Sequence, residues 1–218
     1  MQSRRKSLLL IYQRLFDHYG PQHWWPAESP FEVMLGAILT QNTAWSNVEK
    51  AIANLRARDK LDAAAIVATR KDHLANWLRP SGYFNVKAAR LKHFCHWYEQ
   101  AGGFSSLSQT AGDELRQMLL SVHGIGPETA DDILLYAFQR PVFVIDAYTR
   151  RLFARLQLFA GNESYEALRL AIESALGPDV ALFNEYHALI VRHAKEVCRV
   201  RPRCADCHLR GHCPSGAE

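Results

Sequence analysis

Apolar residues recur along most of this chain with the spacing of an amphipathic α-helix. In the stretch 8–15, leucine, isoleucine and tyrosine fall at positions i, i+3, i+4 and i+7, and the stretches 31–38 and 130–137 repeat this spacing. Such a pattern gathers the apolar side chains on one face of a helix, where they can pack against a neighbouring element. The pattern therefore predicts a helix over each of these stretches.

Glycine, proline and serine separate the periodic stretches. Val142 to Ile145 is the one run that resembles a strand, and it is only four residues long. Residues of this kind interrupt helices because glycine is flexible and proline lacks an amide hydrogen. We therefore predict an all-α protein whose helices are joined by short connections at Gly20-Pro21, Ser29-Pro30, Pro80-Ser81-Gly82, Gly102-Gly103 and Gly177-Pro178.

Length and composition narrow the class of protein. A chain of 218 residues, 48% of them hydrophobic, can bury one large core or the cores of two small lobes. No apolar run approaches the roughly 20 residues that a membrane-spanning helix needs. The basic start of the chain is followed only by a short apolar run, 8–11, which does not match a secretory leader. We expect a cytoplasmic protein, in a reducing compartment.

Four cysteines crowd the end of the chain with the spacing C-x5-C-x2-C-x5-C: Cys198, Cys204, Cys207 and Cys213. The segment is too short to form a helix or strand of its own, so a shared inorganic centre is the natural organiser. Thiolates are soft ligands that select iron–sulfur clusters or zinc. The segment also holds four arginines and one aspartate, a net +3 of the chain's formal +4. A basic loop fixed in this way suits contact with the phosphates of a nucleic acid.

Two other interpretations of the cysteines stay open. Disulfides are disfavoured by the reducing compartment and by the odd fifth thiol, Cys95. Zinc sites built from four thiolates are common, but they usually pair two short C-x2-4-C elements, and only Cys204–Cys207 has that spacing here. The spacing therefore favours a [4Fe–4S] cluster over zinc.

The segment 119–130 has the pattern of a helix-hairpin-helix. An amphipathic helix from about Asp113 enters it, and a second helix leaves it. Gly124 and Gly126 permit positive φ and a close approach of another molecule, while Ile125 between them can anchor the turn in the core. Pro127 suits the first turn of the outgoing helix. The amides of the turn would then face an anion such as a DNA phosphate.

Asp146 follows an apolar run and precedes a helical pattern. Aspartate at such a place is a favoured helix N-cap. A carboxylate a short distance beyond a DNA-binding hairpin has a second use, because it can stabilise an oxocarbenium-like sugar and orient or activate water. Both interpretations predict a carboxylate fixed at a helix start.

Taken together, the hairpin, Asp146 and the cysteine loop resemble the endonuclease III branch of the helix-hairpin-helix (HhH-GPD) DNA glycosylase superfamily over nearly the whole chain. The resemblance implies two helical lobes with DNA bound in a cleft between them, a flipped base and a [4Fe–4S] cluster on the four cysteines. It implies a single glycosylase unit in which about 28–135 form a six-helix lobe with the hairpin, 1–27 and 136–197 form the second lobe, and 198–213 form the cluster loop. Gln41 resembles the family's glutamine that enters the DNA stack, and it joins Gly124, Ile125 and Gly126 as an expected DNA contact.

Two positions depart from endonuclease III. The first gap between the cysteines is one residue shorter than the family's commonest C-x6-C-x2-C-x5-C, although Arg201-Pro202-Arg203 still fits the loop. Glu128 stands where endonuclease III carries the lysine that forms a Schiff base, and a carboxylate cannot form an imine. We therefore expect Asp146 and water to release the base without AP-lyase activity.

The residues around two tryptophans are similar to the family's 3-methyladenine glycosylases. In those members the positions of Trp25, Pro26 and Trp45 form a stacking slot for an alkylated purine, and Glu128 would line it. The physics agrees, because alkylation at N3 or N7 gives the purine a positive charge and indole faces attract cations. Each tryptophan alone is more often a core residue.

The leading hypothesis is a monofunctional base excision repair glycosylase that removes 3-methyladenine-type bases. One rival keeps the fold but acts on mismatched or oxidised pyrimidines, as endonuclease III does, and the Trp-Trp-Pro element argues against it. Another is a non-catalytic module that binds DNA structure, for which a carboxylate at Asp146 would have no use. We expect a monomer that works on double-stranded DNA containing damaged bases, associates with the nucleoid when bound, and has no membrane partner.

Overall fold

The computed structural model describes residues 2–216, and these residues are helical, with no strand in that range. The all-α prediction is confirmed. The strand-like run Val142 to Ile145 is extended but lies in no sheet, and the amide of Phe143 donates instead to Glu173 Oε1 at 2.8 Å. No helix among residues 2–216 is both long enough and apolar enough to cross a membrane.

The chain divides into two compact units. One joins the N-terminal segment up to Pro26 to the segment that begins at Pro141, and the other is Ala27–Arg140. The boundary between Arg140 and Pro141 lies five residues beyond the expected end of the hairpin lobe at about 135. The π-helical turn η2 (Ile133–Ala137) explains this, because it continues directly from helix α9 (Pro127–Asp132) and packs on helix α2 (Pro30–Leu39), both in the 27–140 unit. Arg140 then donates to the carbonyl oxygens of Ser108 and Thr110, both in the same unit.

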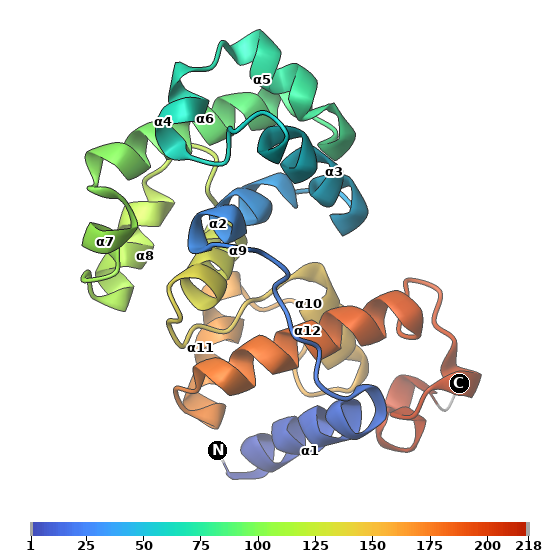
Figure 1. The fold of residues 1–218 in the computed structure, drawn as a ribbon. Coiled ribbons are helices and arrows are strands. Elements are labelled where there is room, and N and C mark those ends of the chain that lie inside the picture. The colour runs from blue at the N-terminus through green and yellow to red at the C-terminus, as the bar shows by residue number, and fades with distance from the viewer. Residues whose placement is uncertain (1, 217–218) are drawn as a thin grey trace. The chain divides into compact units, whose positions relative to one another are not determined.

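The 27–140 unit is built around α2 (Pro30–Leu39), which is buried along most of its length as its nearly continuous apolar sequence requires. Ser29 caps its first turn by accepting from the amide of Glu32 at 3.2 Å. Eight α-helices rather than six fill this part of the described chain, because the connections themselves form short helices (Figure 1). The helices after α2 are α3 (Trp45–Arg56), α4 (Ala63–Ala68), α5 (Lys71–Trp77), α6 (Phe84–Gln100), α7 (Gly103–Leu107), α8 (Gly112–Leu120) and α9 (Pro127–Asp132), with a 3-10 turn η1 (Arg79–Ser81) before α6.

A buried ion pair joins the two helices of the hairpin. Arg116 on α8 donates from Nε to Asp131 Oδ1 at 2.6 Å and from Nη2 to Oδ2 at 3.1 Å. Both side chains are almost fully buried, so the two parallel hydrogen bonds supply the partners that buried charges need. This pair fixes α8 against α9 and so sets the geometry of the turn between them.

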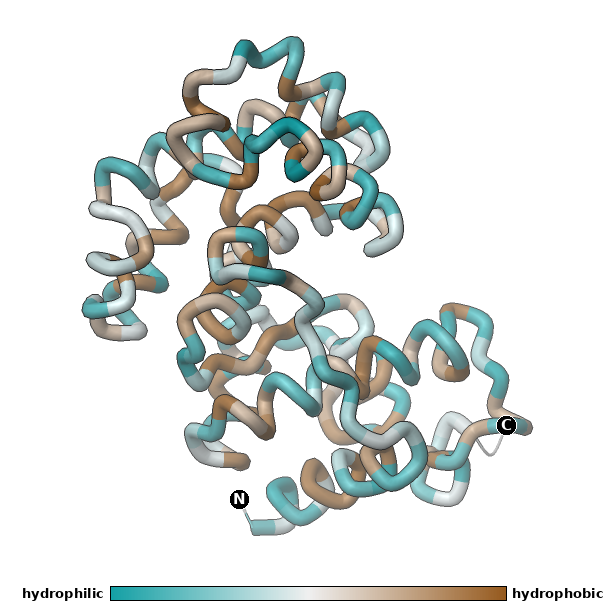
Figure 2. The backbone as a smooth tube through the Cα atoms, in the orientation of Figure 1, coloured by the Kyte–Doolittle hydropathy of each residue, from teal (hydrophilic) through white to brown (hydrophobic). Residues whose placement is uncertain are grey.

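The other unit packs α12 (Val180–Glu196) between α10 (Ala147–Arg155) and α1 (Gln2–Tyr19), as Figure 1 shows. α11 (Tyr165–Leu176) also packs on α1. Hydrophilic and hydrophobic positions alternate along α1 in Figure 2, as expected for a helix with one buried face. The unit ends in three 3-10 turns: η3 (Cys204–Asp206), η4 (Arg210–His212) and η5 (Pro214–Gly216).

Candidate functional site

The hairpin turn in the 27–140 unit is tight, and its apolar centre is buried. Ile125 is buried, as predicted, and its amide donates to the carbonyl of Val122 at 3.0 Å. Gly124 adopts the positive φ that glycine permits, +92°. Gly126 does not: its φ of −95° and ψ of 176° are extended, and a side chain there would meet nothing within 4 Å. The backbone conformation therefore does not require glycine at 126, and the space beside it is open.

Gln41 lies on the hairpin. Its Nε2 donates to the carbonyl of Gly124 at 3.0 Å and to Thr129 Oγ1 at 2.9 Å, and its Oε1 accepts from Arg90 Nη1. The structure thus brings together two predicted site residues, Gln41 and Gly124, that are 83 positions apart in the chain. Arg90 was not expected at this site, and its sequence context offered no signal beyond a basic residue on α6.

Trp45 and Glu128 belong to the same unit as the hairpin. Trp45 is the first residue of α3, is half-buried, and donates from its indole nitrogen to Glu49 Oε1 at 2.9 Å. Glu128 is exposed in the first turn of α9, where its charge suits the positive end of the helix. Their predicted roles in binding a base stay predictions.

Asp146 belongs to the other unit and is the N-cap of α10, as predicted. Its Oδ1 accepts from the amide of Thr149 at 2.7 Å, and its Oδ2 lies 3.5 Å from His187 Nε2. The residue is only 8% exposed. Burial by itself would raise the pKa of this carboxyl, but the hydrogen bond and charge of His187, with the Thr149 amide, outweigh it and hold the pKa below its ordinary value. Asp146 is therefore an ionised, fixed carboxylate.

Two residues of α12 near Asp146 were not singled out from the sequence. His187 is buried, and its Nε2 faces the carboxylate. Burial lowers the pKa of Lys195, while the negative charge of Asp146 opposes that shift. A buried histidine on the inner face of the last long helix was the available signal, but only the packing of α12 against α10 makes it a partner of Asp146.

The Trp-Trp-Pro element lies in the same unit as Asp146. The rings of Trp24 and Trp25 stand edge to face, with centroids 5.8 Å apart and an interplanar angle of 81°. Lys195 Nζ is 5.9 Å from the centroid of the Trp24 ring and 5.8 Å from that of Tyr148, the second residue of α10. Both tryptophans are half-buried and Pro26 is exposed. The lysine thus connects the aromatic pair to the helix that Asp146 caps.

The four clustered cysteines line one small cavity of about 40 Å³. Its apolar wall comes from Leu152, Leu156 and Leu209. The cysteines are buried or half-buried, whereas the four arginines between them are exposed: Arg199, Arg201, Arg203 and Arg210. Within residues 2–216 the five cysteines form no disulfide.

α10 holds this loop in place through two arginines. Arg151 Nε donates to the carbonyl of Cys198 at 2.9 Å. Arg155 donates to the carbonyls of Arg199 and Val200 at 2.6 and 2.9 Å and approaches Cys198 Sγ at 3.3 Å. The helix that begins at Asp146 is therefore fastened at its other end to the cysteine loop.

The chemistry of the donor set fits a thiolate-bound centre. Burial raises the pKa of Cys207 and of Cys213, and the neighbouring thiols raise it further. A bound cation would offset this cost of ionising several thiols together. Among residues 2–216, however, no three potential ligands converge tightly enough to hold one metal ion.

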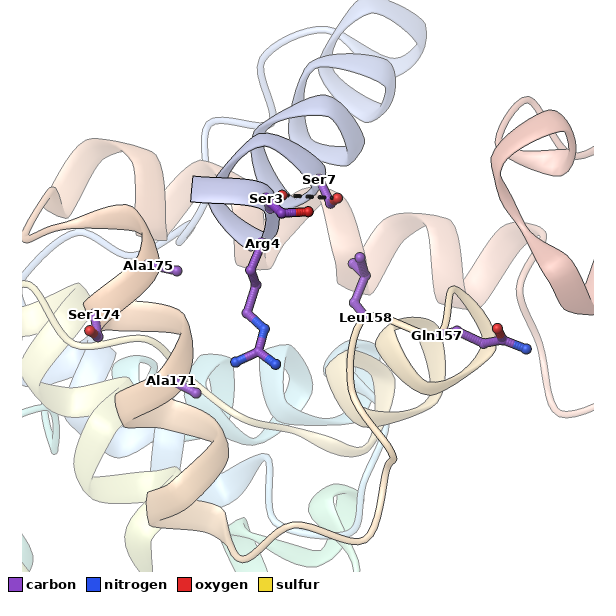
Figure 3. A pocket seen from close by; sticks show the side chains of 8 residues that line it. All are labelled: Ser3, Arg4, Ser7, Gln157, Leu158, Ala171, Ser174 and Ala175. Atoms are coloured by element: carbon purple, nitrogen blue, oxygen red, sulfur yellow. Dashed lines mark hydrogen bonds between the residues drawn. The ribbon is translucent and has the colours of Figure 1, made fainter. Parts of the chain in front are cut away.

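A further cavity in this unit, of about 490 Å³, lies away from these residues (Figure 3). Arg4 projects into it, with Cζ 4.9 Å from the centre of the Phe159 ring. Apart from Leu158, its other lining residues are small or polar, and none of them is a candidate site residue: Ser3, Ser7, Gln157, Leu158, Ala171, Ser174 and Ala175.

Comparison with known proteins shows a consistent set of relatives. The chain is 43% identical over 217 residues to a provisionally named DNA repair glycosylase of Methanocaldococcus jannaschii, covering 98% of this chain and 99% of that protein. Its fold is similar to that of an H. pylori 3-methyladenine DNA glycosylase (MagIII) bound to 1,N6-ethenoadenine. That similarity has a TM-score of 0.75 at 30% identity and covers 88% of this chain and 97% of that one. A non-covalent endonuclease III–DNA complex has a TM-score of 0.84 at 18% identity, covering 98% and 96%, and shows the shared fold.

The family model of the HhH-GPD superfamily base excision DNA repair proteins matches residues 35–178. This range includes the hairpin, Gln41 and Asp146. The match covers well over half of the chain, and the M. jannaschii relative matches nearly all of it. The chain therefore belongs to the HhH-GPD superfamily of base excision DNA repair proteins.

Proposed function

We propose that this DNA glycosylase is monofunctional and hydrolyses the N-glycosidic bond of alkylated purines of the 3-methyladenine type. The observation that carries the proposal is the state of Asp146: buried, ionised and held in place by His187 and the Thr149 amide. A helix cap alone needs neither the burial nor the histidine. A fixed carboxylate is what a reaction through an oxocarbenium-like sugar requires.

Asp146 supplies two functions in the proposed reaction. Its negative charge stabilises the positive charge that develops on the sugar as the bond to the base lengthens. It also accepts the proton of the water whose oxygen bonds to C1′, while the base leaves with the electron pair of the broken bond. An alkylated purine already carries a positive charge, so it leaves as a neutral molecule. Base flipping must come first, because the bond is out of reach in a stacked duplex.

The monofunctional mode is supported by two positions, Glu128 and Lys87. Glu128 stands at the position where endonuclease III carries a lysine. Lys87, another candidate nucleophile, is only 1% exposed and donates to the carbonyls of Leu39 and Ser81 at 2.8 and 2.6 Å. Burial lowers its pKa to about 8. Its two hydrogen bonds nevertheless hold the amine between the end of α2 and Ser81. Neither residue offers an amine to the sugar.

The assignment of an alkylated purine as the substrate is supported by the aromatic pair in the unit that contains Asp146. Trp24 and Trp25 present electron-rich rings, and Lys195 shows that this aromatic surface already attracts a cation. The H. pylori relative at 30% identity is named a 3-methyladenine glycosylase and was solved with a modified adenine bound. The sequence resemblance alone adds Trp45, Pro26 and Glu128 to the same binding site.

The proposal assigns DNA contacts to the hairpin and to Gln41. The first amides of α9 have no acceptor within the helix, so they can bind a backbone phosphate. Gln41 is proposed to occupy the place that the flipped base leaves in the DNA stack. Its hydrogen bonds to Gly124 and Thr129 support this, because they hold the glutamine on the DNA-binding turn.

We further propose a [4Fe–4S] cluster on the four cysteines. The four cysteines line one cavity, which supports a single thiolate-bound centre. Their spacing in the sequence, with only one short C-x2-C pair, favours the cluster over zinc. When bound, the cluster would close the loop and keep its arginines turned outward toward phosphate.

Two tryptophan variants test the substrate. Stacking on a base is worth about 1–3 kcal/mol by alanine substitution, so Trp25→Ala or Trp45→Ala should lower single-turnover excision of 3-methyladenine roughly ten- to a hundredfold. Binding to abasic duplex should barely change, because no base fills the pocket. Gly126→Ala is the matched contrast: its new methyl group obstructs phosphate, so affinity for every duplex should fall. Equal loss of affinity in the tryptophan variants would make the aromatics a general DNA clamp and refute the substrate assignment.

A further inference from the structure

Arg90 belongs to a hydrogen-bond network in the 27–140 unit that is centred on Gln41. Its Nη1 donates to Gln41 Oε1, and the other end of the same amide donates to Gly124 and Thr129. Three protein partners thus fix both the position and the orientation of the Gln41 amide. Without Arg90 the amide oxygen would lose its partner, and the side chain could turn away from the hairpin.

The stem of Arg90 is packed on the hairpin itself. A Cβ atom placed on Gly124 would stand 2.5 Å from Arg90 Cγ and 2.9 Å from Cδ, closer than carbon atoms can approach. The turn therefore needs glycine at 124 for two reasons, its φ of +92° and the arginine that crosses it. The pairing of Arg90 with the turn is built into the backbone.

The charge of Arg90 has no acidic counterpart. None of the ion pairs found within residues 2–216 involves its guanidinium, although the residue is half-buried. Burial lowers the pKa of Lys87, and the positive charge of Arg90 lowers it further. The contacts of this arginine are therefore with the Gln41 amide and with the hairpin turn, rather than with a counter-ion.

We propose that Arg90 is a positioning residue for Gln41. It holds the glutamine on the hairpin. As a result, the turn binds the backbone phosphate and Gln41 fills the gap in the DNA stack at the same time. The guanidinium acts through Gln41 and does not touch the reacting sugar. This inference rests on the proposed role of Gln41 in DNA, and it assigns a function to a residue on α6.

The test uses a duplex that carries a tetrahydrofuran abasic analogue opposite 2-aminopurine, with the full-length protein. Fluorescence at saturating protein reports the occupied gap and does not depend on which damaged base is the substrate. Wild type should change the fluorescence. Arg90→Ala, Arg90→Lys and Gln41→Ala should each remove most of that change, since lysine cannot reproduce the geometry of the guanidinium fork. The double variant Gln41→Ala/Arg90→Ala should lose no more than Gln41→Ala alone.

Excision of 3-methyladenine in single turnover should fall roughly tenfold or more in Arg90→Lys, as for loss of a charge-assisted hydrogen bond. Arg58→Ala is the matched control in the same unit, because Arg58 stacks on Trp77 at 5.3 Å and donates to one carbonyl, and it should behave as wild type. Thermal melting checks that Arg90→Lys is folded.

Several results would overturn the inference. Arg90→Lys with a normal fluorescence change, or effects of the two single variants that add in the double variant, would make Arg90 a simple phosphate contact. A wild-type protein that binds the duplex tightly without any fluorescence change would show that Gln41 does not fill the gap. That outcome would refute the positioning role of Arg90. The proposed glycosylase function would be tested separately, by measuring base release.

Discussion

Replacement of Asp146 by asparagine separates its two structural roles from its proposed chemical role. Asparagine keeps the shape of the side chain and an oxygen that can accept from the Thr149 amide at the present 2.7 Å, and it is as good an N-cap as aspartate. What it loses is the negative charge, and with it the charge-assisted contact to His187 at 3.5 Å. The helix start should therefore survive while the chemistry fails.

The structure sets the expected magnitudes. Retention of the cap limits the loss of stability to about 1 kcal/mol, the order of magnitude of one weakened polar contact, here the 3.5 Å contact to His187. Removal of a base that accepts a proton in the transition state costs about 10²- to 10⁴-fold in rate. Asp146→Asn should therefore release 3-methyladenine at least a hundredfold more slowly, while its melting temperature and its affinity for abasic duplex stay close to those of wild type.

The assay is single-turnover base release from a methylated duplex, with thermal melting of each variant. Asp179→Asn is a matched control: Asp179 caps α12 in the same unit by accepting from the Leu182 amide at 2.9 Å, but it is exposed. It should retain full activity. If Asp146→Asn releases base within a fewfold of the wild-type rate, Asp146 is only a helix cap and the catalytic assignment is wrong.

Three further predictions follow from the same contacts. Borohydride should trap no enzyme–DNA adduct, and strand cleavage should require alkali. Efficient trapping would identify an amine, and the first to replace would be Lys195, whose pKa is lowered by burial and raised by the charge of Asp146. Cys204→Ser should lower the iron content from about four per chain and weaken DNA binding, whereas one stoichiometric zinc in the wild type would contradict the cluster. The lowered pKa of Asp146 adds stability that is present above the unfolded pKa of about 4 and is lost as pH falls through the lower folded pKa. Melting temperatures measured at descending pH should therefore fall less for Asp146→Asn than for wild type. Equal falls would argue against a depressed pKa.

The sequence contained enough to predict the helical class and the main motifs. Periodicity and breaker residues depend on local geometry, so the helices and the buried Ile125 could be read directly. Asp146 followed from local rules as well, because a capping aspartate is recognisable where an apolar run meets a helix. The extent of the units was harder, since η2 stays with α2 through packing that no local pattern records.

The partners of the site residues required the structure. His187 lies 41 positions from Asp146, and Arg90 lies 49 positions from Gln41. Helix packing alone brings these pairs together, and many histidines and arginines in the chain have similar local contexts. Gly124 and Gly126 both permit a positive φ, but only Gly124 adopts one, and the sequence does not distinguish the two.

Mass spectrometry of released bases tests the central claim most directly. Wild-type protein is incubated with methylated duplex and, in parallel, with duplexes that contain uracil, thymine glycol or a thymine mismatch. Free 3-methyladenine should appear from the methylated duplex, leaving an abasic strand that is intact until alkali is added. Release of thymine glycol or mismatched thymine with no release of 3-methyladenine would contradict the account, because it would place this chain among glycosylases of pyrimidines.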